Sequence, residues 1–194
     1  MFKKILFISL IAIVVSNSIS TNRALSDSNI KSLNAMLIQQ DFSLVDKNEK
    51  KIHKFNLMGK PTILFFGFTH CPDVCPTTLN TLSTLLEKLG DDKNKFNIYF
   101  ISVDPERDNT KILRDYLSSF DSKINGLTGD PKQIQILTSQ FGIYVEKVLQ
   151  NNGDYTMDHS AMMLLLDKNT KLVSTLTYQE SQSVALDKLK NLLR

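Results

Sequence analysis

Residues 61–79 read PTILFFGFTHCPDVCPTTL, and this stretch decides the fold. The segment from Pro61 to Phe68 is an almost continuous apolar run, which is typical of a central strand buried on both faces. After Pro76, leucines recur at helical spacing as far as Gly90, and this pattern predicts a helix that ends at the glycine. The stretch therefore predicts a buried strand, a short loop with two cysteines, and a helix.

The same two patterns alternate along the rest of the chain. Residues 96–103 form another apolar run and are expected to be a second buried strand. Periodic apolar residues predict a helix after Asp108 or Asn109, its candidate N-caps, and another helix that is entered through Pro131. The remaining elements are an N-terminal hairpin (41–46 and 50–55), a late hairpin (161–166 and 172–177) and a closing amphipathic helix (186–193). This order predicts an α/β fold, a thioredoxin-like sandwich with an additional N-terminal β-hairpin.

Composition and charge place the chain among ordinary globular proteins. Of its 194 residues, 42% are apolar and 22% are charged, which suits one domain with a buried core plus a short extension. The formal net charge is +3, and Lys3 and Lys4 supply two of these charges. Because the remainder is nearly neutral, no clustered basic face is expected, and nucleic acid is excluded as a partner.

The N-terminus has the pattern of an export signal. Lys3 and Lys4 precede an apolar run from Ile5 to Val15 that is interrupted only by Ser9. A spanning helix needs about 20 apolar residues, and this run is shorter. A cleaved signal peptide and an uncleaved membrane anchor therefore both stay open.

These features divide the chain into three segments. Residues 1–20 are the signal peptide or N-terminal membrane anchor, and residues 21–38, which are polar and rich in Ser and Asn, predict a flexible linker. Residues 39–194 are the thioredoxin-like domain. Either alternative at the N-terminus exports this domain, to the periplasmic face of a bacterial inner membrane or to the periplasm itself.

Both cysteines of the chain, Cys71 and Cys75, lie in the loop between the predicted strand and helix. The carboxyl end of a parallel strand is where α/β proteins place their sites. Each cysteine precedes a proline, and Pro76 suits the first helical position, so Cys75 is expected to be the N-cap. A thiol at that place faces unpaired amides and the positive end of the helix, so its pKa is expected to be lowered.

On the residues alone, three interpretations of this pair stay open. A structural disulfide would stabilise the fold by only about 2 kcal/mol, because the loop it closes is short. Dithiol–disulfide exchange is the second, although thioredoxin-type enzymes carry two residues between the cysteines where this chain has three. The third is a metal site. Where such enzymes place a cis-proline, this chain has Asp158-His159-Ser160, and an imidazole there favours metal.

Two thiolates and the imidazole of His159 form a soft donor set. Such ligands suit monovalent copper and can also hold the divalent ion, whereas structural zinc nearly always takes four protein ligands. His70, Asp73 and Asp158 are candidates for tuning the ligands from close by, and an Asp after Pro is equally typical of a turn. The charged residues 104–108 are interpreted as a solvated turn that leads into a helix.

The chain resembles the Sco/SenC family of copper-binding assembly factors of cytochrome c oxidase. The resemblance covers approximately Phe42 to Leu193. It is carried by GFTHCPDVCP, SVDPERD, LTG and YTMDHS, which begin at residues 67, 102, 127 and 155. The turn after Leu166 departs from the family pattern, because it lacks the usual glycine, and residues 172–183 follow the pattern only loosely. Neither departure touches the candidate ligands.

The resemblance implies a thioredoxin fold, an N-terminal anchor, and copper ligation by Cys71, Cys75 and His159. It also implies a metallochaperone and not an enzyme, which delivers copper to the dinuclear copper centre of cytochrome c oxidase or keeps the cysteines of that centre reduced. The expected partners are the copper-accepting subunit of the oxidase, another copper chaperone as donor, and the membrane through the N-terminus. The alternative is an exported thiol–disulfide oxidoreductase that works without metal, through a redox-active disulfide between Cys71 and Cys75.

Overall fold

The computed structural model describes residues 40–151 and 153–194. The predicted signal or anchor over residues 1–20 and the linker over residues 21–38 lie outside this described part. Within it, no helix combines the length and the apolar character needed to cross a membrane.

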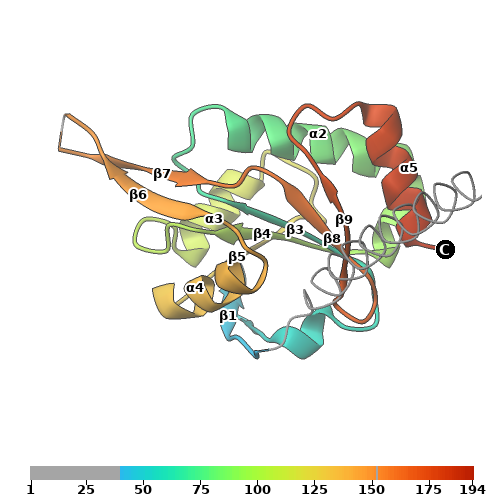
Figure 1. Ribbon diagram of the computed structural model, residues 1–194, viewed down its shortest axis with the longest axis horizontal. Coiled ribbons are helices and arrows are strands. Elements are labelled where there is room, and N and C mark those ends of the chain that lie inside the picture. The colour runs from blue at the N-terminus through green and yellow to red at the C-terminus, as the bar shows by residue number, and fades with distance from the viewer. Residues whose placement is uncertain (1–39, 152) are drawn as a thin grey trace, which may run out of the picture. The chain divides into compact units, whose positions relative to one another are not determined.

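A central mixed sheet organises the described residues (Figure 1). Its strands are β1 (Leu44–Asp46), β2 (Lys51–Ile52), β3 (Thr62–Gly67), β4 (Asn97–Ser102), β5 (Asn125–Thr128), β8 (Met163–Leu166) and β9 (Leu172–Leu176). Their spatial order is β2-β1-β5-β4-β3-β8-β9. The three strands β3, β4 and β5 run parallel, and β8 pairs antiparallel with β3. All six residues of β3 are buried, which confirms the central strand that its apolar run predicted.

Four helices of the described part cover the two faces of this sheet. They are α2 (Val74–Leu89), α3 (Thr110–Leu117), α4 (Pro131–Gln140) and α5 (Gln182–Leu192). Helices α2 and α5 lie along one face, and α4 lies on the opposite side (Figure 1). On the first face the Phe100 ring of β4 contacts Tyr116 of α3, with ring centroids 5.9 Å apart. The shorter 3-10 helices are η1 (Lys54–Leu57) and η2 (Gly90–Lys95).

The helix starts test the predicted caps. Asn109 caps α3, because its side chain accepts a hydrogen bond from the Ile112 N–H at 3.0 Å. The prediction that Cys75 is the N-cap of α2 is wrong: the helix begins at Val74, after Asp73. Pro76 therefore lies inside the first turn, where a missing N–H costs nothing because those amides have no partner within the helix. Cys75 is thus part of the helix and not its cap.

The N-terminal strands are shorter than predicted. β1 pairs antiparallel with β2 over two residue pairs, and β1 also pairs with β5, so it belongs to the main sheet. The predicted second strand over 50–55 ends early, because Lys54–Leu57 turns into the 3-10 helix η1.

A two-stranded ribbon, absent from the sequence-based prediction, lies outside the main sheet. It consists of β6 (Val145–Leu149) and β7 (Tyr155–His159), which pair antiparallel and form no ladder with the other strands. Every described residue of the ribbon's strands is exposed or only half-buried. The ribbon ends at His159, so a candidate ligand is carried by an element that the apolar pattern did not reveal.

Candidate metal centre

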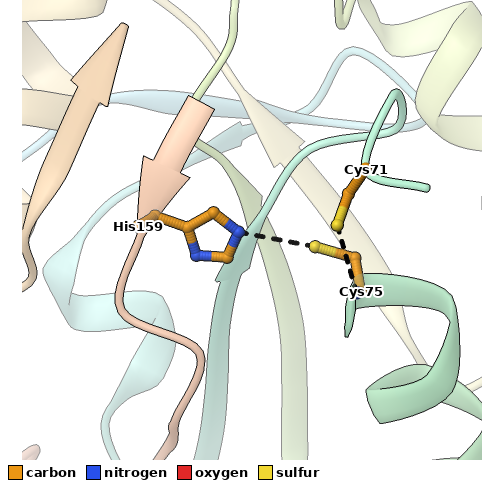
Figure 2. A group of neighbouring side chains, drawn as sticks. All are labelled: Cys71, Cys75 and His159. Atoms are coloured by element: carbon orange, nitrogen blue, oxygen red, sulfur yellow. Dashed lines mark hydrogen bonds between the residues drawn. The ribbon is translucent and has the colours of Figure 1, made fainter. Parts of the chain in front are cut away.

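Three side chains from three different segments converge at one end of the sheet. Cys71 comes from the loop after β3, Cys75 from the first turn of α2, and His159 from the last position of β7 (Figure 2). The two sulfur atoms and a ring nitrogen of His159 all lie within 4.8 Å of one another. In the part of the chain that the structure describes, this is the only group of three or more Cys, His, Asp or Glu side chains placed to hold a metal.

The imidazole of His159 is oriented by the backbone beside it. Its Nδ1 lies 3.0 Å from the Ser160 carbonyl oxygen, which can only accept, so Nδ1 carries the hydrogen. Nε2 then carries the free lone pair, and this atom lies 3.5 Å from the Cys75 sulfur. The Phe68 ring packs edge-on against the imidazole at 5.8 Å between centroids. A backbone acceptor on the far nitrogen is how metal-binding histidines are commonly held.

The two thiols differ sharply in acidity. The hydrogen bond from the Cys75 thiol, helped by the Cys75 backbone N–H at 3.3 Å from the Cys71 sulfur, lowers the pKa of Cys71 to about 4 against the cost of burial. The same hydrogen bond, together with burial, raises the pKa of Cys75 far above its usual range. The expectation that Cys75 is the acidic thiol is therefore reversed, because the pair shares one proton and the more exposed sulfur holds the charge.

Gly67 makes room for the buried thiol. It is the last residue of β3, and a Cβ at this position would lie 2.9 Å from the Cys75 sulfur and 2.7 Å from the Phe100 ring. Such distances are shorter than side chains tolerate. The absence of a side chain at Gly67 thus lets the first turn of α2 pack its cysteine directly on the sheet.

The three residues predicted to tune the ligands have different places. Asp73 precedes α2. Its backbone N–H hydrogen-bonds Cys71, whereas its carboxylate accepts from the Thr77 hydroxyl. His70 is exposed and directs Nδ1 toward the Thr69 hydroxyl, at 3.1 Å. Asp158 is exposed on β7, and because neighbouring strand residues point to opposite faces, its carboxylate points away from the centre.

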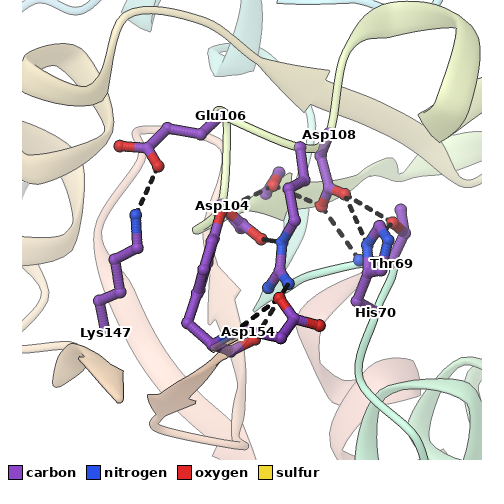
Figure 3. A network of polar contacts seen from close by, with 10 residues as sticks. Thr69, His70, Asp104, Glu106, Asp108, Lys147 and Asp154 are labelled. Carbon is purple, nitrogen blue, oxygen red and sulfur yellow. Dashed lines mark hydrogen bonds and ion pairs between the residues drawn. The ribbon is translucent and has the colours of Figure 1, made fainter. Parts of the chain in front are cut away.

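The interpretation of residues 104–108 as a solvated turn is wrong, because both of its aspartates are buried. Asp108 is fully buried and accepts hydrogen bonds from the Thr69 N–H at 3.0 Å, from the Thr69 hydroxyl, and from Ser102 at 2.7 Å (Figure 3). It thereby holds the cysteine loop two residues before Cys71. The signal in the sequence for this role was the pair of aspartates, Asp104 and Asp108, that follows directly after a buried strand.

Asp104 is only 2% exposed, and it contacts the ribbon as Asp108 contacts the cysteine loop. Its carboxylate accepts from the Tyr155 hydroxyl at 2.8 Å and forms an ion pair with Arg107. Arg107 in turn donates to the Tyr155 carbonyl oxygen at 3.0 Å, and its guanidinium lies 3.6 Å from the centre of the Tyr155 ring. This second set of contacts fixes β7 four residues before His159.

The family is decided by comparison with known sequences. A family model described as SCO1/SenC matches residues 31–194, which is most of the chain. The chain belongs to the SCO1/SenC family. This confirms the resemblance seen in the sequence motifs.

Individual SCO1/SenC relatives agree with this assignment. The mitochondrial protein SCO1 homolog 1 of Arabidopsis thaliana is 40% identical over 133 residues, a match that covers 68% of this chain and 40% of the relative. A SCO2-like protein of Rickettsia prowazekii is 35% identical over 152 residues, which cover 77% of this chain and 74% of that protein. The chain thus spans less than half of the plant protein and about three quarters of the bacterial one.

A solved SCO1/SenC structure matches the fold. The structure of Bradyrhizobium japonicum ScoI with copper bound is 44% identical, aligns with a TM-score of 0.74, and covers 79% of this chain and 98% of its own. This likeness confirms the thioredoxin-like α/β fold class. The bound copper is a feature of the structure of that relative.

Proposed function

We propose that the chain is a copper metallochaperone that carries the ion on Cys71, Cys75 and His159. The observation that supports this most directly is the convergence of two sulfur atoms and a histidine nitrogen within 4.8 Å. The orientation of His159 adds to it, because the Ser160 carbonyl occupies Nδ1 and leaves Nε2 directed at the sulfurs.

The donor set fits copper better than other metals. Thiolates and imidazole are soft or borderline ligands, which suit monovalent copper and also hold the divalent ion. A structural zinc site takes four protein ligands, and among the described residues no fourth Cys, His, Asp or Glu joins this group. The site has only three ligands, and Cys71 and His159 are half-buried. Such a site suits a copper ion that is later released to an acceptor protein.

Each ligand has its own part in this function. Cys71 is a thiolate over the physiological pH range, since its pKa is lowered to about 4, and so it is ready to bind a metal ion without first losing a proton. Cys75 is buried and releases its proton when a metal ion takes the place of that hydrogen. His159 completes the set from the ribbon, with its Nε2 directed at the Cys75 sulfur.

The biological setting is proposed from the family and from the N-terminal pattern. We infer that the chaperone assists assembly of the dinuclear copper centre of cytochrome c oxidase, with the copper-accepting subunit as acceptor and another copper chaperone as donor. Residues 1–20 serve as signal or anchor, residues 21–38 as linker and residues 39–194 as the domain. The domain then lies in the periplasm, at the inner membrane or free of it.

A second candidate is an exported thiol–disulfide oxidoreductase without metal. The acidity of Cys71 favours it, because a stable thiolate beside a second thiol is the arrangement that attacks disulfides. In this candidate Cys71 and Cys75 form a redox-active disulfide, and His159 is dispensable.

Copper binding by the full chain separates the two candidates. We expect one copper(I) per wild-type chain, measured by competition with a chromophoric chelator, and a substantially weaker complex for His159→Ala. His53→Ala is the matched control, because that imidazole hydrogen-bonds the Phe42 carbonyl and lies outside the group. Equal copper affinity of His159→Ala and wild type would contradict the three-ligand site. Full disulfide reductase activity of that variant would then favour the oxidoreductase.

Oxidation provides an independent test. A Cys71–Cys75 disulfide removes both thiolates, so the oxidised chain should bind no copper(I), and reduction should restore binding. Unchanged copper(I) binding by the fully oxidised chain would show that the cysteines are not the ligands.

A further inference from the structure

The two halves of the candidate metal centre belong to separate parts of the fold. The cysteines lie on the loop and helix that follow β3, while His159 lies at the end of the ribbon β6–β7. No backbone ladder joins the ribbon to the main sheet among the described residues. The half-buried side chains of Val145 and Met157 pack against the core, but no ribbon residue is fully buried. The separation between sulfurs and imidazole is therefore not set by the sheet itself.

One loop touches both halves. Residues 102–108 comprise the last residue of β4 and the loop after it, and Figure 3 shows Asp104 and Asp108 of this segment between the cysteine loop and the ribbon. On the cysteine side, Asp108 accepts two hydrogen bonds from Thr69. On the ribbon side, Asp104 and Arg107 hold Tyr155. The two sides meet at Ser102, whose hydroxyl donates to Asp108 and accepts from the Asp104 N–H at 3.0 Å.

Arg107 is the residue of this loop with most contacts to the ribbon. Its Nε pairs with Asp104, its terminal nitrogen donates to the Tyr155 carbonyl oxygen and to the Asp154 carboxylate at 3.3 Å, and its flat guanidinium lies against the Tyr155 ring. A guanidinium makes these contacts together because it is planar and has several donors in fixed directions, which an ammonium group lacks. Its side chain is 18% exposed, so water screens these contacts only in part.

We propose that Arg107 is a positioning residue that sets the place of His159 relative to the two cysteines. Arg107 does not touch the metal. It acts through Tyr155, which lies on the same strand as the histidine, while Asp108 anchors the cysteine loop to the same segment. The inference rests on the proposed function, since it explains how that three-ligand site is kept assembled.

Arg107→Lys tests this role with the least disturbance. Lysine keeps a positive charge beside the buried Asp104 carboxylate. It loses the planar contact with the Tyr155 ring and the hydrogen bond to the Tyr155 carbonyl oxygen. Residues that orient a metal ligand typically contribute about 10-fold to 100-fold in metal affinity, so we expect copper(I) affinity of the full chain to fall by that order. Arg114→Lys is the matched control, because Arg114 also donates to a backbone carbonyl, that of Lys47, away from the ribbon.

The decisive measurement is a double-mutant cycle with His159→Ala. If Arg107 acts through the histidine, Arg107→Lys should change copper affinity by less than about 2-fold once His159 is absent, since residues in one network are not additive. Loss of the same factor in both backgrounds, or no loss in either, would overturn the proposal. The thiolate-to-copper(II) absorption band is the second readout, and that of Arg107→Lys should shift toward the band of His159→Ala.

Three further outcomes are distinguishable. If Arg107→Lys does not fold, as judged by circular dichroism, Tyr155→Leu replaces it in the cycle. This variant removes the ring contact with Arg107 and the hydroxyl that donates to Asp104, and it leaves the Asp104–Arg107 pair intact. If His159→Ala binds copper as tightly as wild type, the proposed function fails, and the positioning role fails with it. A weakened His159→Ala together with an unaffected Arg107→Lys would overturn the positioning role alone.

Discussion

At the scale of single residues, the two cysteines are unequal partners. Cys71 is half-buried and Cys75 is fully buried, and the hydrogen bond between them moves their pKa values in opposite directions. The positive end of a helix lowers the pKa of a single thiol, and on that basis Cys75 was predicted to be acidic. In the pair, however, the negative charge lies on the Cys71 sulfur, which has more access to water, and the proton stays on the Cys75 sulfur, which packs against the sheet.

This asymmetry predicts the alkylation behaviour of the metal-free chain. Because the pKa of Cys71 is lowered to about 4, its reactive thiolate is present throughout the range from about pH 5 to about pH 8. The rate of Cys71 alkylation by iodoacetamide, followed by mass spectrometry of the labelled peptide, should be nearly constant over that range, and Cys75 should remain unlabelled. An ordinary thiol loses about tenfold in rate per pH unit below its pKa of about 8.5.

Cys75→Ala is the informative comparison for this prediction. It removes the thiol hydrogen bond that stabilises the Cys71 thiolate, so the pKa of Cys71 should rise and its alkylation should slow toward acidic pH. If the rate of Cys71 alkylation in the wild-type chain already falls about tenfold for each pH unit below pH 8, the proton is not held on Cys75.

At the scale of elements, the sequence was most informative where an element is buried. The strand β3 and the helix α2 were predicted because all six residues of β3 face the core and the leucines of α2 line one buried side. The ribbon β6–β7 was missed because none of its described residues is fully buried, so neither an apolar run nor a strict alternation appears. His159 was found as a candidate only through its place before β8 and through the family motif.

The ribbon should therefore be the least protected ladder of the described part. An isolated two-stranded ribbon is marginally stable, and this one is held by side chains and not by the main sheet. In hydrogen exchange measured by mass spectrometry, amides of β6 and β7 should exchange faster than those of β3 and β4. Copper(I) should slow exchange in the ribbon, because it ties His159 to the cysteines, and should leave α5 unchanged. Ribbon amides protected as strongly as β3 without copper would contradict this account.

At the scale of the whole molecule, the candidate site joins segments that are far apart in the chain. Between Cys75 and the strand of His159 lie η2, β4, α3, β5, α4 and β6, and no local spacing rule connects the two cysteines to the histidine. The fold class followed from the order of strands and helices, whereas the convergence of the three ligand atoms required the structure. A metal ion bound there links the cysteine loop, α2 and the ribbon.

Copper should accordingly stabilise the folded chain as a whole. A ligand that binds only the folded state at about 100 times its dissociation constant adds about 2.7 kcal/mol, which for a domain of this size raises the melting temperature by roughly 5 to 10 °C. Thermal unfolding with and without copper(I) measures this shift, which should be much smaller for His159→Ala. An undiminished shift in a chain with Cys71→Ser and Cys75→Ser would place the stabilising ion elsewhere.

The close packing of the Cys75 sulfur on Gly67 also gives ligand exchange a direction. The Cys75 sulfur lies against the sheet and is buried, whereas Cys71 and His159 are half-buried, so solvent reaches the site on the side of these two residues. In the proposed function, an acceptor thiolate that arrives from that side displaces an outer ligand first, and Cys75 is the last to release the ion. The order of hand-over is thus determined by a missing side chain in the sheet, and the protein keeps one bond to its cargo until the acceptor has formed its own.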